Sequence, residues 1–131
     1  MLQELYSNAY VYVLPSDLEG MPLSLLEAMS YGNCCLTSDI PECAEVVGHH
    51  GLTFQKGDTE DLRRVLKDLC EQPLAVQDYK RKAWLLYERA WQAADQYCGY
   101  DCHQSLVCRT WSCCVQLLQV AAENERQPAG R

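Results

Sequence analysis

Three short runs of apolar residues, separated from one another by segments with helical spacing, are the feature that most constrains the fold of this chain of 131 residues. The runs extend from Ala9 to Leu14, from Cys34 to Thr37 and from Leu52 to Phe54. A short and wholly apolar run is typical of a strand covered on both faces, as the strands of a parallel sheet are. Pro15 directly follows the first run and marks its end.

Helical patterns fill the segments between and after these runs. They extend from Leu23 to Tyr31, from Pro41 to Val47, from about Thr59 to Leu69 and from Leu74 to about Tyr97. The predicted order is therefore β-α-β-α-β-α-α. Strands that alternate with helices require crossovers, which place helices on both faces of a parallel sheet. The sequence thus predicts an α/β fold with a parallel sheet and a helical C-terminal part.

Residues with special backbone preferences mark the expected ends of the helices. Gly32 stands where a helix C-cap would lie, directly after the first predicted helix. Ser38 or Asp39 is expected to cap the second helix, which has a proline in its first turn. Asp58 or Thr59 is expected to cap the third helix, whose first turn carries two acids that suit the helix dipole.

Charge and hydropathy exclude two classes of partner. The chain has 11 Lys and Arg residues against 18 Asp and Glu residues, which gives a net charge of −7. It therefore lacks the basic face that binds a nucleic acid backbone. Its apolar runs are only a few residues long, so none can cross a bilayer as a helix. We expect neither a nucleic acid partner nor a transmembrane segment.

Cysteine usage and the N-terminus indicate a cytoplasmic protein. The nine cysteines are odd in number and irregular in spacing, which argues against the disulfide framework of a secreted domain. The first ten residues lack the basic segment of a signal peptide and include Glu4. The expected location is the cytoplasm, with the thiols reduced.

The composition changes near Tyr97, which we take as a boundary. Residues 98–131 hold five of the nine cysteines and are expected to be poorly ordered or helical. Cys98, Cys102 and His103 lie close together in the sequence, but the cysteines lack the paired spacing of a structural zinc site, so no metal is predicted. A shift of reading frame or a truncated gene would also enrich Cys, Trp and Arg abruptly, and this is a second hypothesis for the ending.

The segment after the first predicted strand, 15–22, is the part of the chain best suited to bind a ligand. In a parallel α/β sheet, ligands bind at the carboxyl ends of the strands. This segment leads into a helix N-terminus, whose free N–H groups and partial positive charge favour phosphate. Gly20 would let the backbone approach a ligand closely. Glu19 and Glu27 bracket the turn, and each could bind hydroxyl groups at one end of a polyol ligand.

This loop and helix also fit the frame PS-x-x-EG-x-x-x-x-x-LEAM-x-x-G. Its positions are filled by Pro15, Ser16, Glu19, Gly20, Leu26, Glu27, Ala28, Met29 and Gly32. The frame, with its two Glu residues in an E-x7-E pattern, resembles the donor-binding motif of the retaining group 1 (family 4-like) glycosyltransferases of GT-B fold. The resemblance covers roughly residues 1–90. It implies that residues 1–97 are a Rossmann-like partial domain, the C-terminal part of a GT-B donor-binding domain.

The resemblance implies a role for each matching residue. The implied donor-binding residues are Glu19, Gly20, Met21, Leu23, Ser24, Leu25 and Glu27. Glu19 would contact the hydroxyls of the donor sugar and is the implied catalytic residue, whereas Glu27 would accept hydrogen bonds from the ribose. Backbone amides of the loop would line the sugar and phosphate, and the start of the helix would face the pyrophosphate. The nucleotide-sugar is a substrate, and the family generally needs no metal or other cofactor.

A simpler interpretation exists for several of these features. Ser24 and Glu27 also match the S-x-x-E capping box, in which the Glu side chain serves only its own helix. Glu19 alone would be a solvated loop acid. The surrounding frame favours the ligand role for both carboxylates. Outside the loop, the residues expected simply to face solvent are His49, His50 and the run Lys80-Arg81-Lys82.

The predicted function combines the resemblance with the parts of the family pattern that have no counterpart here. We expect a glycosyltransferase-type fragment that binds a nucleotide-sugar for retaining transfer of a sugar to an acceptor hydroxyl. The acceptor domain and the first half of the donor domain have no counterpart, so the isolated chain is expected to be inactive. The alternative is a non-catalytic nucleotide-sugar-binding or pairing fragment, either a remnant or one chain of a split enzyme whose other chain carries the missing domains.

Overall fold

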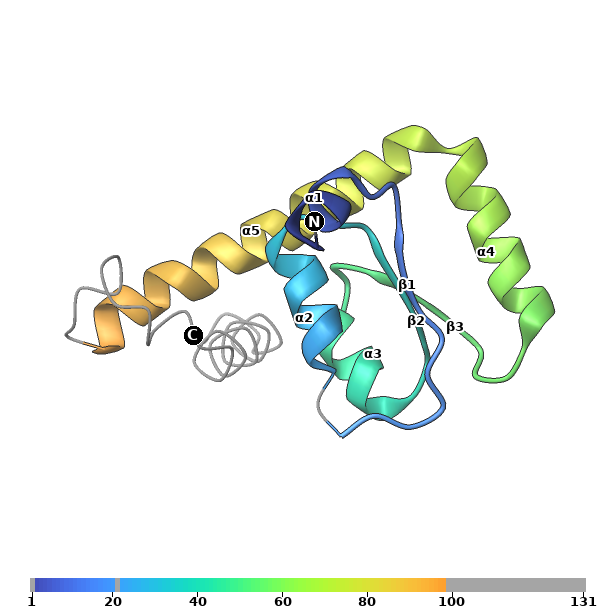
Figure 1. Ribbon diagram of the computed structural model, residues 1–131, viewed down its shortest axis with the longest axis horizontal. Coiled ribbons are helices and arrows are strands. Elements are labelled where there is room, and N and C mark those ends of the chain that lie inside the picture. Colours follow the sequence, from blue (N-terminus) through green and yellow to red (C-terminus); the bar gives the residue numbers. More distant parts are fainter. Residues whose placement is uncertain (1, 21, 99–131) are drawn as a thin grey trace, which may run out of the picture.

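The computed structural model describes residues 2–20 and 22–98, which form an α/β unit (Figure 1). The elements in chain order are α1 (Leu2–Asn8), β1 (Tyr12–Leu14), α2 (Leu23–Ser30), β2 (Cys35–Ser38), α3 (Pro41–Val47), β3 (Leu52–Phe54), α4 (Thr59–Glu71) and α5 (Pro73–Cys98). The predicted alternation of strands and helices is confirmed, and the fold is a Rossmann-like partial domain. The predicted cysteine-rich tail lies outside the described residues, apart from Cys98 at the end of α5.

The sheet has three parallel strands in the order β1-β2-β3. In the register, Val13 pairs with Leu36 and Thr37 pairs with Thr53. All four residues of the central strand β2 are buried, as expected for a strand with neighbours on both edges and helices on both faces. Helices α2, α3 and α4 all begin near the carboxyl ends of the strands, so the loops that precede them gather at one edge of the sheet (Figure 1).

A separate hydrophobic cluster covers each face of the sheet. The first cluster is built largely from α2 and α3 and includes Leu25, Leu26, Met29, Cys35, Cys43 and Val47. The second joins β2 and β3 to α4 and includes Cys34, Leu36, Phe54, Val65 and Leu69. Helix α5 serves both clusters, because Val76 belongs to the second and Leu86 to the first. Cys34, directly before β2, and Cys35, the first residue of β2, therefore pack into opposite cores, as the alternation of side chains along an extended backbone requires.

The N-terminal part differs from the prediction in two ways. Helix α1 was not among the predicted elements, and β1 begins only at Tyr12 rather than at Ala9. The residues before Tyr12 are tied to helices instead of to the sheet. The carbonyl of Ala9 accepts a hydrogen bond from Lys80 Nζ at 2.7 Å, and the Tyr10 hydroxyl donates to the Leu69 carbonyl at 2.8 Å. These contacts divert the chain before β1 starts.

The predicted helix ends are confirmed in two cases and wrong in one. Gly32 has a φ of 69° just after α2, a left-handed backbone that glycine adopts without strain. Asp58 is the N-cap of α4, and its side chain accepts a hydrogen bond from the Asp61 N–H. Helix α3, however, is capped by Ile40 without a side-chain hydrogen bond, rather than by Ser38 or Asp39. The side chains of those two residues have other partners.

Two surface predictions are also corrected. His50 is only 8% exposed. In the turn after α3, its backbone N–H donates a hydrogen bond to the Val47 carbonyl, and its ring centroid lies 4.9 Å from that of His49. His49 is exposed, as predicted. Lys80 does not simply face solvent, since its ammonium group binds the Ala9 carbonyl. Arg81 and Lys82 form ion pairs with Asp78 on the same helix.

Candidate functional site

The loop after β1 is fastened to the end of β2 by two serine hydroxyls. The buried Ser38, the last residue of β2, donates a hydrogen bond to the Ser16 carbonyl. The Ser16 hydroxyl in turn donates to Glu19 Oε1 at 2.5 Å. Ser38 is thus occupied in holding the loop, which explains why it does not cap α3. The Glu19 carboxylate is held in place by its own loop and, through that loop, by the sheet.

Helix α2 begins without a side-chain cap. Its N-cap residue is Pro22, which has neither an N–H group nor a side-chain acceptor, and no acid lies in the first turn. The first N–H bonded within the helix is that of Leu26, which donates to the Pro22 carbonyl at 3.2 Å. Helix geometry leaves the preceding N–H groups, those of Leu23, Ser24 and Leu25, without an acceptor in the helix. These groups and the helix dipole favour an anion at this position.

The capping-box interpretation of Ser24 and Glu27 is wrong. Ser24 is the second residue of α2 rather than its N-cap, so its hydroxyl is not placed to cap the helix. The Glu27 charge instead acts on the phenols of Tyr6 and Tyr12, and it raises the pKa of each beyond the shift that burial causes.

Tyr12 is the residue around which the polar groups of this region gather. Burial raises the pKa of its phenol, the hydrogen bond with Ser24 opposes that shift, and the charges of Glu19 and Glu27 both raise the pKa further. Glu19 also approaches α3: burial raises the pKa of the Cys43 thiol to about 11, and the charges of Glu19 and Glu42 add to the shift. The structure thus brings both predicted carboxylates into the electrostatic surroundings of one phenol.

The tip of the loop is open to solvent. Leu18 is 84% exposed and Leu23 is 45% exposed. A Cβ atom built on Gly20 would meet no atom within 4 Å, and the backbone of Gly20 is not in the left-handed region. Nothing in the described fold therefore requires glycine at this position. Met21 lies outside the described residues, and a single cleft shared by Glu19 and Glu27 stays a prediction.

Two hollows flank this region. One, of about 140 Å³, lies at the carboxyl edge of the sheet between the loop and the start of α4, and its lining includes Ser16, Asp17, Ser38, Phe54 and Asp58. The other, of about 680 Å³, lies beside α1 and is lined mainly by apolar atoms from residues that include Leu2, Leu5, Tyr6 and Tyr12. Neither tyrosine was among the predicted site residues: Tyr6 lies on α1, which was not predicted, and Tyr12 lies within an apolar strand.

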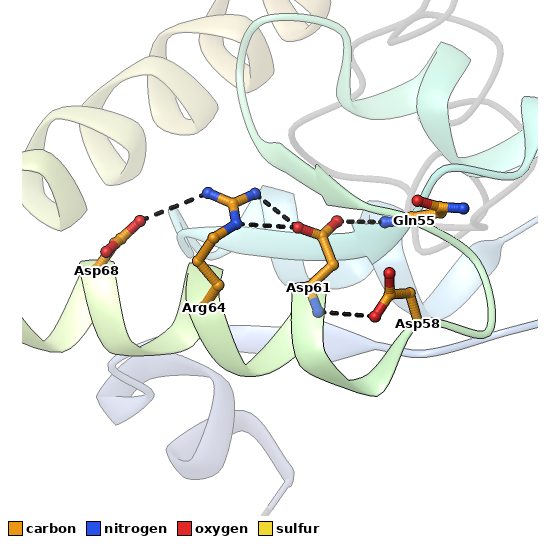
Figure 2. Close-up of polar contacts among 5 residues, drawn as sticks. All are labelled: Gln55, Asp58, Asp61, Arg64 and Asp68. Carbon is orange, nitrogen blue, oxygen red and sulfur yellow. Dashed lines mark hydrogen bonds and ion pairs between the residues drawn. The ribbon is translucent and has the colours of Figure 1, made fainter.

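Helix α4, unlike α2, is closed at its start by its own side chains (Figure 2). Asp58 Oδ1 accepts from the Asp61 N–H at 3.0 Å, and Asp61 Oδ2 accepts from the Gln55 N–H at 2.7 Å. Asp61 Oδ1 also accepts from Arg64 Nη2 at 2.6 Å, and Arg64 lies 3.7 Å from Asp68. The Gln55 N–H and the Arg64 guanidinium hold the pKa of Asp61 below its usual value. An anion would meet two carboxylates here.

Comparison with known proteins identifies the family. The family model described as glycosyl transferases group 1 matches residues 1–72, which is more than half of the chain. This match includes the loop after β1, all of α2 and the whole three-stranded sheet. The chain belongs to the group 1 glycosyltransferases. The resemblance inferred from the loop frame is therefore confirmed at the level of the family.

Several curated relatives of this group 1 glycosyltransferase chain are named for sugar transfer. One is the N,N'-diacetylbacillosaminyl-diphospho-undecaprenol alpha-1,3-N-acetylgalactosaminyltransferase of Campylobacter jejuni, which is 36% identical over 70 residues, 52% of this chain and 19% of the relative. Another is the serotype-specific mannosyltransferase WbdA of Escherichia coli, 40% identical over 63 residues, 48% of this chain and 8% of the relative. A third is the O-antigen chain mannosyltransferase RfbU of Salmonella typhimurium, 33% identical over 75 residues, 57% of this chain and 21% of the relative.

The matched region is a small part of each relative, about a fifth of the first and less than a tenth of the second. No solved structure matches the chain significantly. Among the described residues, no helix has the length and apolar character that a membrane span requires. Within the same residues, no group of three or more His, Cys, Asp or Glu side chains is placed to hold a metal ion.

Proposed function

We propose that this chain binds a nucleotide-sugar donor at the start of α2, as the donor-side part of a glycosyl transfer reaction. The observation that carries the proposal is the uncapped start of α2, whose free N–H groups come between Glu19 and Glu27 in the sequence. A nucleotide-sugar has the matching order of groups: a ribose with two hydroxyls, a diphosphate, and a sugar with several hydroxyls. Amides suit the diphosphate, and carboxylates suit the hydroxyls at either end.

The two carboxylates take different ends of the donor in this proposal. Glu27 accepts hydrogen bonds from the ribose hydroxyls, and Glu19 accepts them from the donor sugar and is the candidate catalytic residue. The loop backbone at Gly20 and Leu23 approaches the sugar and phosphate. Two features support this assignment: the hydroxyl that holds Glu19, and the absence among the described residues of any packing reason for glycine at position 20.

The proposed reaction is transfer of the sugar to an acceptor hydroxyl with retention of configuration, without a metal or other cofactor. Such transfer needs an acceptor held against the anomeric carbon, a contribution of about 7–11 kcal/mol in favourable cases. It also needs stabilisation of the leaving diphosphate, where one preorganised group contributes about 3 kcal/mol. We expect the 131-residue chain to bind the donor weakly and to transfer nothing alone. The proposed setting is the cytoplasm, in keeping with the free thiols of Cys34, Cys35, Cys43 and Cys70 in the described part of the chain.

The second candidate function is donor binding without catalysis, as a remnant or as one chain of a split enzyme. The matched region spans 19% and 8% of the length of the first two relatives, so it corresponds to only part of what those relatives contain. Addition of a separately expressed chain that carries the remaining domains would restore transfer in a split enzyme. It would not do so for a remnant.

Calorimetric titration of the purified chain tests the proposed function. The ligands are UDP, GDP and their sugar conjugates, with N-acetylgalactosamine and mannose included because the relatives are named for these sugars. Glu27→Ala should weaken both the free nucleotide and the nucleotide-sugar. Glu19→Ala should weaken only the nucleotide-sugar, since the free nucleotide has no donor sugar to contact.

The matched control is Glu60→Ala, which removes an exposed acid from α4 and should leave every affinity unchanged. Equal losses in all three variants would show that the effect is only one of net charge. Unchanged binding in both Glu19→Ala and Glu27→Ala would refute the proposed site, and turnover by the chain alone would refute the predicted inactivity.

A further inference from the structure

Strand β1 lies at an edge of the sheet but has none of the features that usually protect an edge. The run from Ala9 to Leu14 is wholly apolar, without a charge or a proline inside it. Natural sheets protect an exposed edge with charged side chains, proline or bulges. Within the described unit β1 pairs only with β2, and its three residues are partly buried, whereas all four residues of β2 are buried. The outer edge of β1 is therefore open to another strand.

The backbone of Val13 presents the unpaired groups of this edge. The Tyr12 N–H donates to the Cys34 carbonyl at 2.8 Å, so the backbone groups of Tyr12 face β2. Successive residues of a strand direct their N–H and C=O groups to opposite sides of the strand. Those of Val13 therefore point away from β2, where residues 2–20 and 22–98 supply no strand. Unpaired groups of this kind are a template for a strand from another chain.

The surface next to this edge is apolar and nearly uncharged. The hollow of about 680 Å³ beside α1 is lined by residues of α1 and by Tyr12. Leu2 and Leu5, which also line it, are each more than half exposed. Glu4 is the one charged residue in the sequence 1–16. The same patch thus offers both projecting leucines and an apolar hollow to receive them, the self-complementarity that a two-fold interface requires.

The opposite edge of the sheet is built differently, and this difference decides how many copies can associate. The Phe54 carbonyl faces β2, because it accepts a hydrogen bond from the Asp39 N–H, so the outward groups of β3 are those of Thr53. The Thr53 side chain is exposed and polar, and Lys56 follows shortly after the strand. Polar and charged side chains of this kind protect an edge. A unit with one open and one protected edge pairs once, so association closes at two copies.

We propose that the outer edge of β1 and the apolar surface of α1 form a self-association face, on which a second copy of this chain docks about a two-fold axis. The two β1 strands pair antiparallel, as the symmetry requires, and Leu2 and Leu5 of each copy enter the hollow of the other. Apart from Glu4, every charged residue follows position 16, so the net charge of −7 lies outside this face. Salt should therefore strengthen the dimer, because it screens the general repulsion between the copies. The inference does not depend on the proposed function.

Sedimentation velocity of the purified chain tests the inference over about 1–100 µM, the range in which a small interface associates. The wild type should reach twice the mass of the chain. Val13→Pro removes the outward N–H, a change that an edge strand tolerates. Leu5→Glu places a charge on the apolar face without loss of a buried side chain, since α1 has none. Each should weaken the dimer about tenfold or more, because an unpaired polar group or charge becomes buried.

The matched controls make the same chemical changes elsewhere. Thr53→Pro removes the outward N–H of β3, and Leu74→Glu adds the same charge to an exposed leucine of α5. Both should leave the dimer unchanged, and circular dichroism melting shows which variants fold. If Val13→Pro does not fold, Leu5→Glu decides the outcome, because it changes an exposed side chain. Equal weakening in the controls would show general destabilisation and would overturn the inference.

Amide hydrogen exchange gives a second readout on the wild type. The Val13 amide should exchange more slowly as the concentration rises through the dimer range, whereas the Thr53 amide should exchange at one rate throughout. A monomer at every concentration would overturn the proposal, as would a dimer that survives both Val13→Pro and Leu5→Glu. Growth into large assemblies would overturn the two-copy closure. A complex formed only with a separate chain of a split enzyme would assign the edge to that chain instead and would also overturn the proposal.

Discussion

Helices α2 and α4 begin at the same edge of the sheet but differ in how their first turns are satisfied. Helix α4 has Asp58 as a side-chain cap and two acids in its first turn, Glu60 and Asp61. Helix α2 has Pro22 at the N-cap and no acid in the corresponding turn. Each helix begins with N–H groups that have no acceptor within the helix, and only α4 has side-chain acceptors at its start.

The difference separates a structural helix start from one that is suited to bind an anion. The start of α4 carries its own acceptors, since the Asp61 N–H donates to the Asp58 carboxylate and the Gln55 N–H donates to the Asp61 carboxylate (Figure 2). The start of α2 gives up the stabilisation of a cap, about 1 kcal/mol. Within the described residues, its compensation comes from elsewhere, because Leu25 and Leu26 are almost fully buried in the core.

The largest expected effect comes from giving α2 an acid of the kind that α4 has. Leu23→Glu places a carboxylate in the first turn of α2 at a position that is 45% exposed, so little packing is lost. Repulsion of the donor diphosphate should weaken nucleotide binding by about tenfold or more. The interaction with the helix dipole should meanwhile stabilise the fold slightly, by about 0.3–1 kcal/mol of unfolding free energy. Calorimetry and thermal denaturation measure the two effects.

Leu23→Gln is the matched control for this change, because it has the same shape without the charge. It should bind nucleotide nearly as the wild type does. If the Gln and Glu variants lose the same affinity, the side chain rather than the charge is responsible, and the start of α2 is not an anion site.

The next effect concerns stability and compares the two starts directly. Asp58→Ala removes the cap of α4 and should lower the free energy of unfolding by about 1 kcal/mol. Ser24→Ala should cost less than about 0.5 kcal/mol, because Ser24 caps nothing and lies in the helix. Urea denaturation measures both. If Ser24→Ala lowered the free energy of unfolding as much as Asp58→Ala does, Ser24 would act as a helix cap, contrary to the structure.

The helix starts also show which caps can be predicted from the sequence and which cannot. The cap of α4 was predicted because Asp58 interacts only with residues close to it in the chain. Ser38 and Asp39 looked equally good as caps of α3, but Ser38 bonds to Ser16 and Asp39 bonds to the Lys56 N–H. Partners so distant in the sequence leave no local pattern.

The same argument applies to the candidate site. Glu19 and Glu27 were found because they belong to a frame of neighbouring residues within a single loop and helix. Tyr6 and Tyr12, whose phenol pKa values the Glu27 charge raises, were missed, because each comes from a different element and approaches the carboxylate only after folding. His50 was assigned to solvent for the same reason.

A smaller effect follows from the pKa of Asp61. Its folded value lies below the usual value of about 3.9. A lowered folded pKa means that the stabilising contribution is complete above the unfolded value and is lost as pH falls through the folded value. The urea concentration at the unfolding midpoint should therefore decrease as the pH is lowered below about 4. In Asp61→Asn this decrease should be smaller. An identical pH profile for Asp61→Asn would contradict the network of Figure 2.

The smallest expected effect is that of Gly20→Ala, and it tests why the loop before α2 has a glycine. An added Cβ would meet nothing within 4 Å and the backbone is not left-handed, so the free energy of unfolding should change by less than about 0.5 kcal/mol. Gly51→Ala is the contrasting case, because its Cβ would lie 2.9 Å from the Cys35 carbonyl oxygen and should destabilise the fold clearly. If Gly20 is present for a ligand, Gly20→Ala should weaken nucleotide-sugar binding by about threefold through loss of close backbone approach. Unchanged affinity together with unchanged stability would mean that the loop tip contacts neither the protein nor the donor. Glu19 would then bind the donor sugar without a backbone contact from Gly20 beside it.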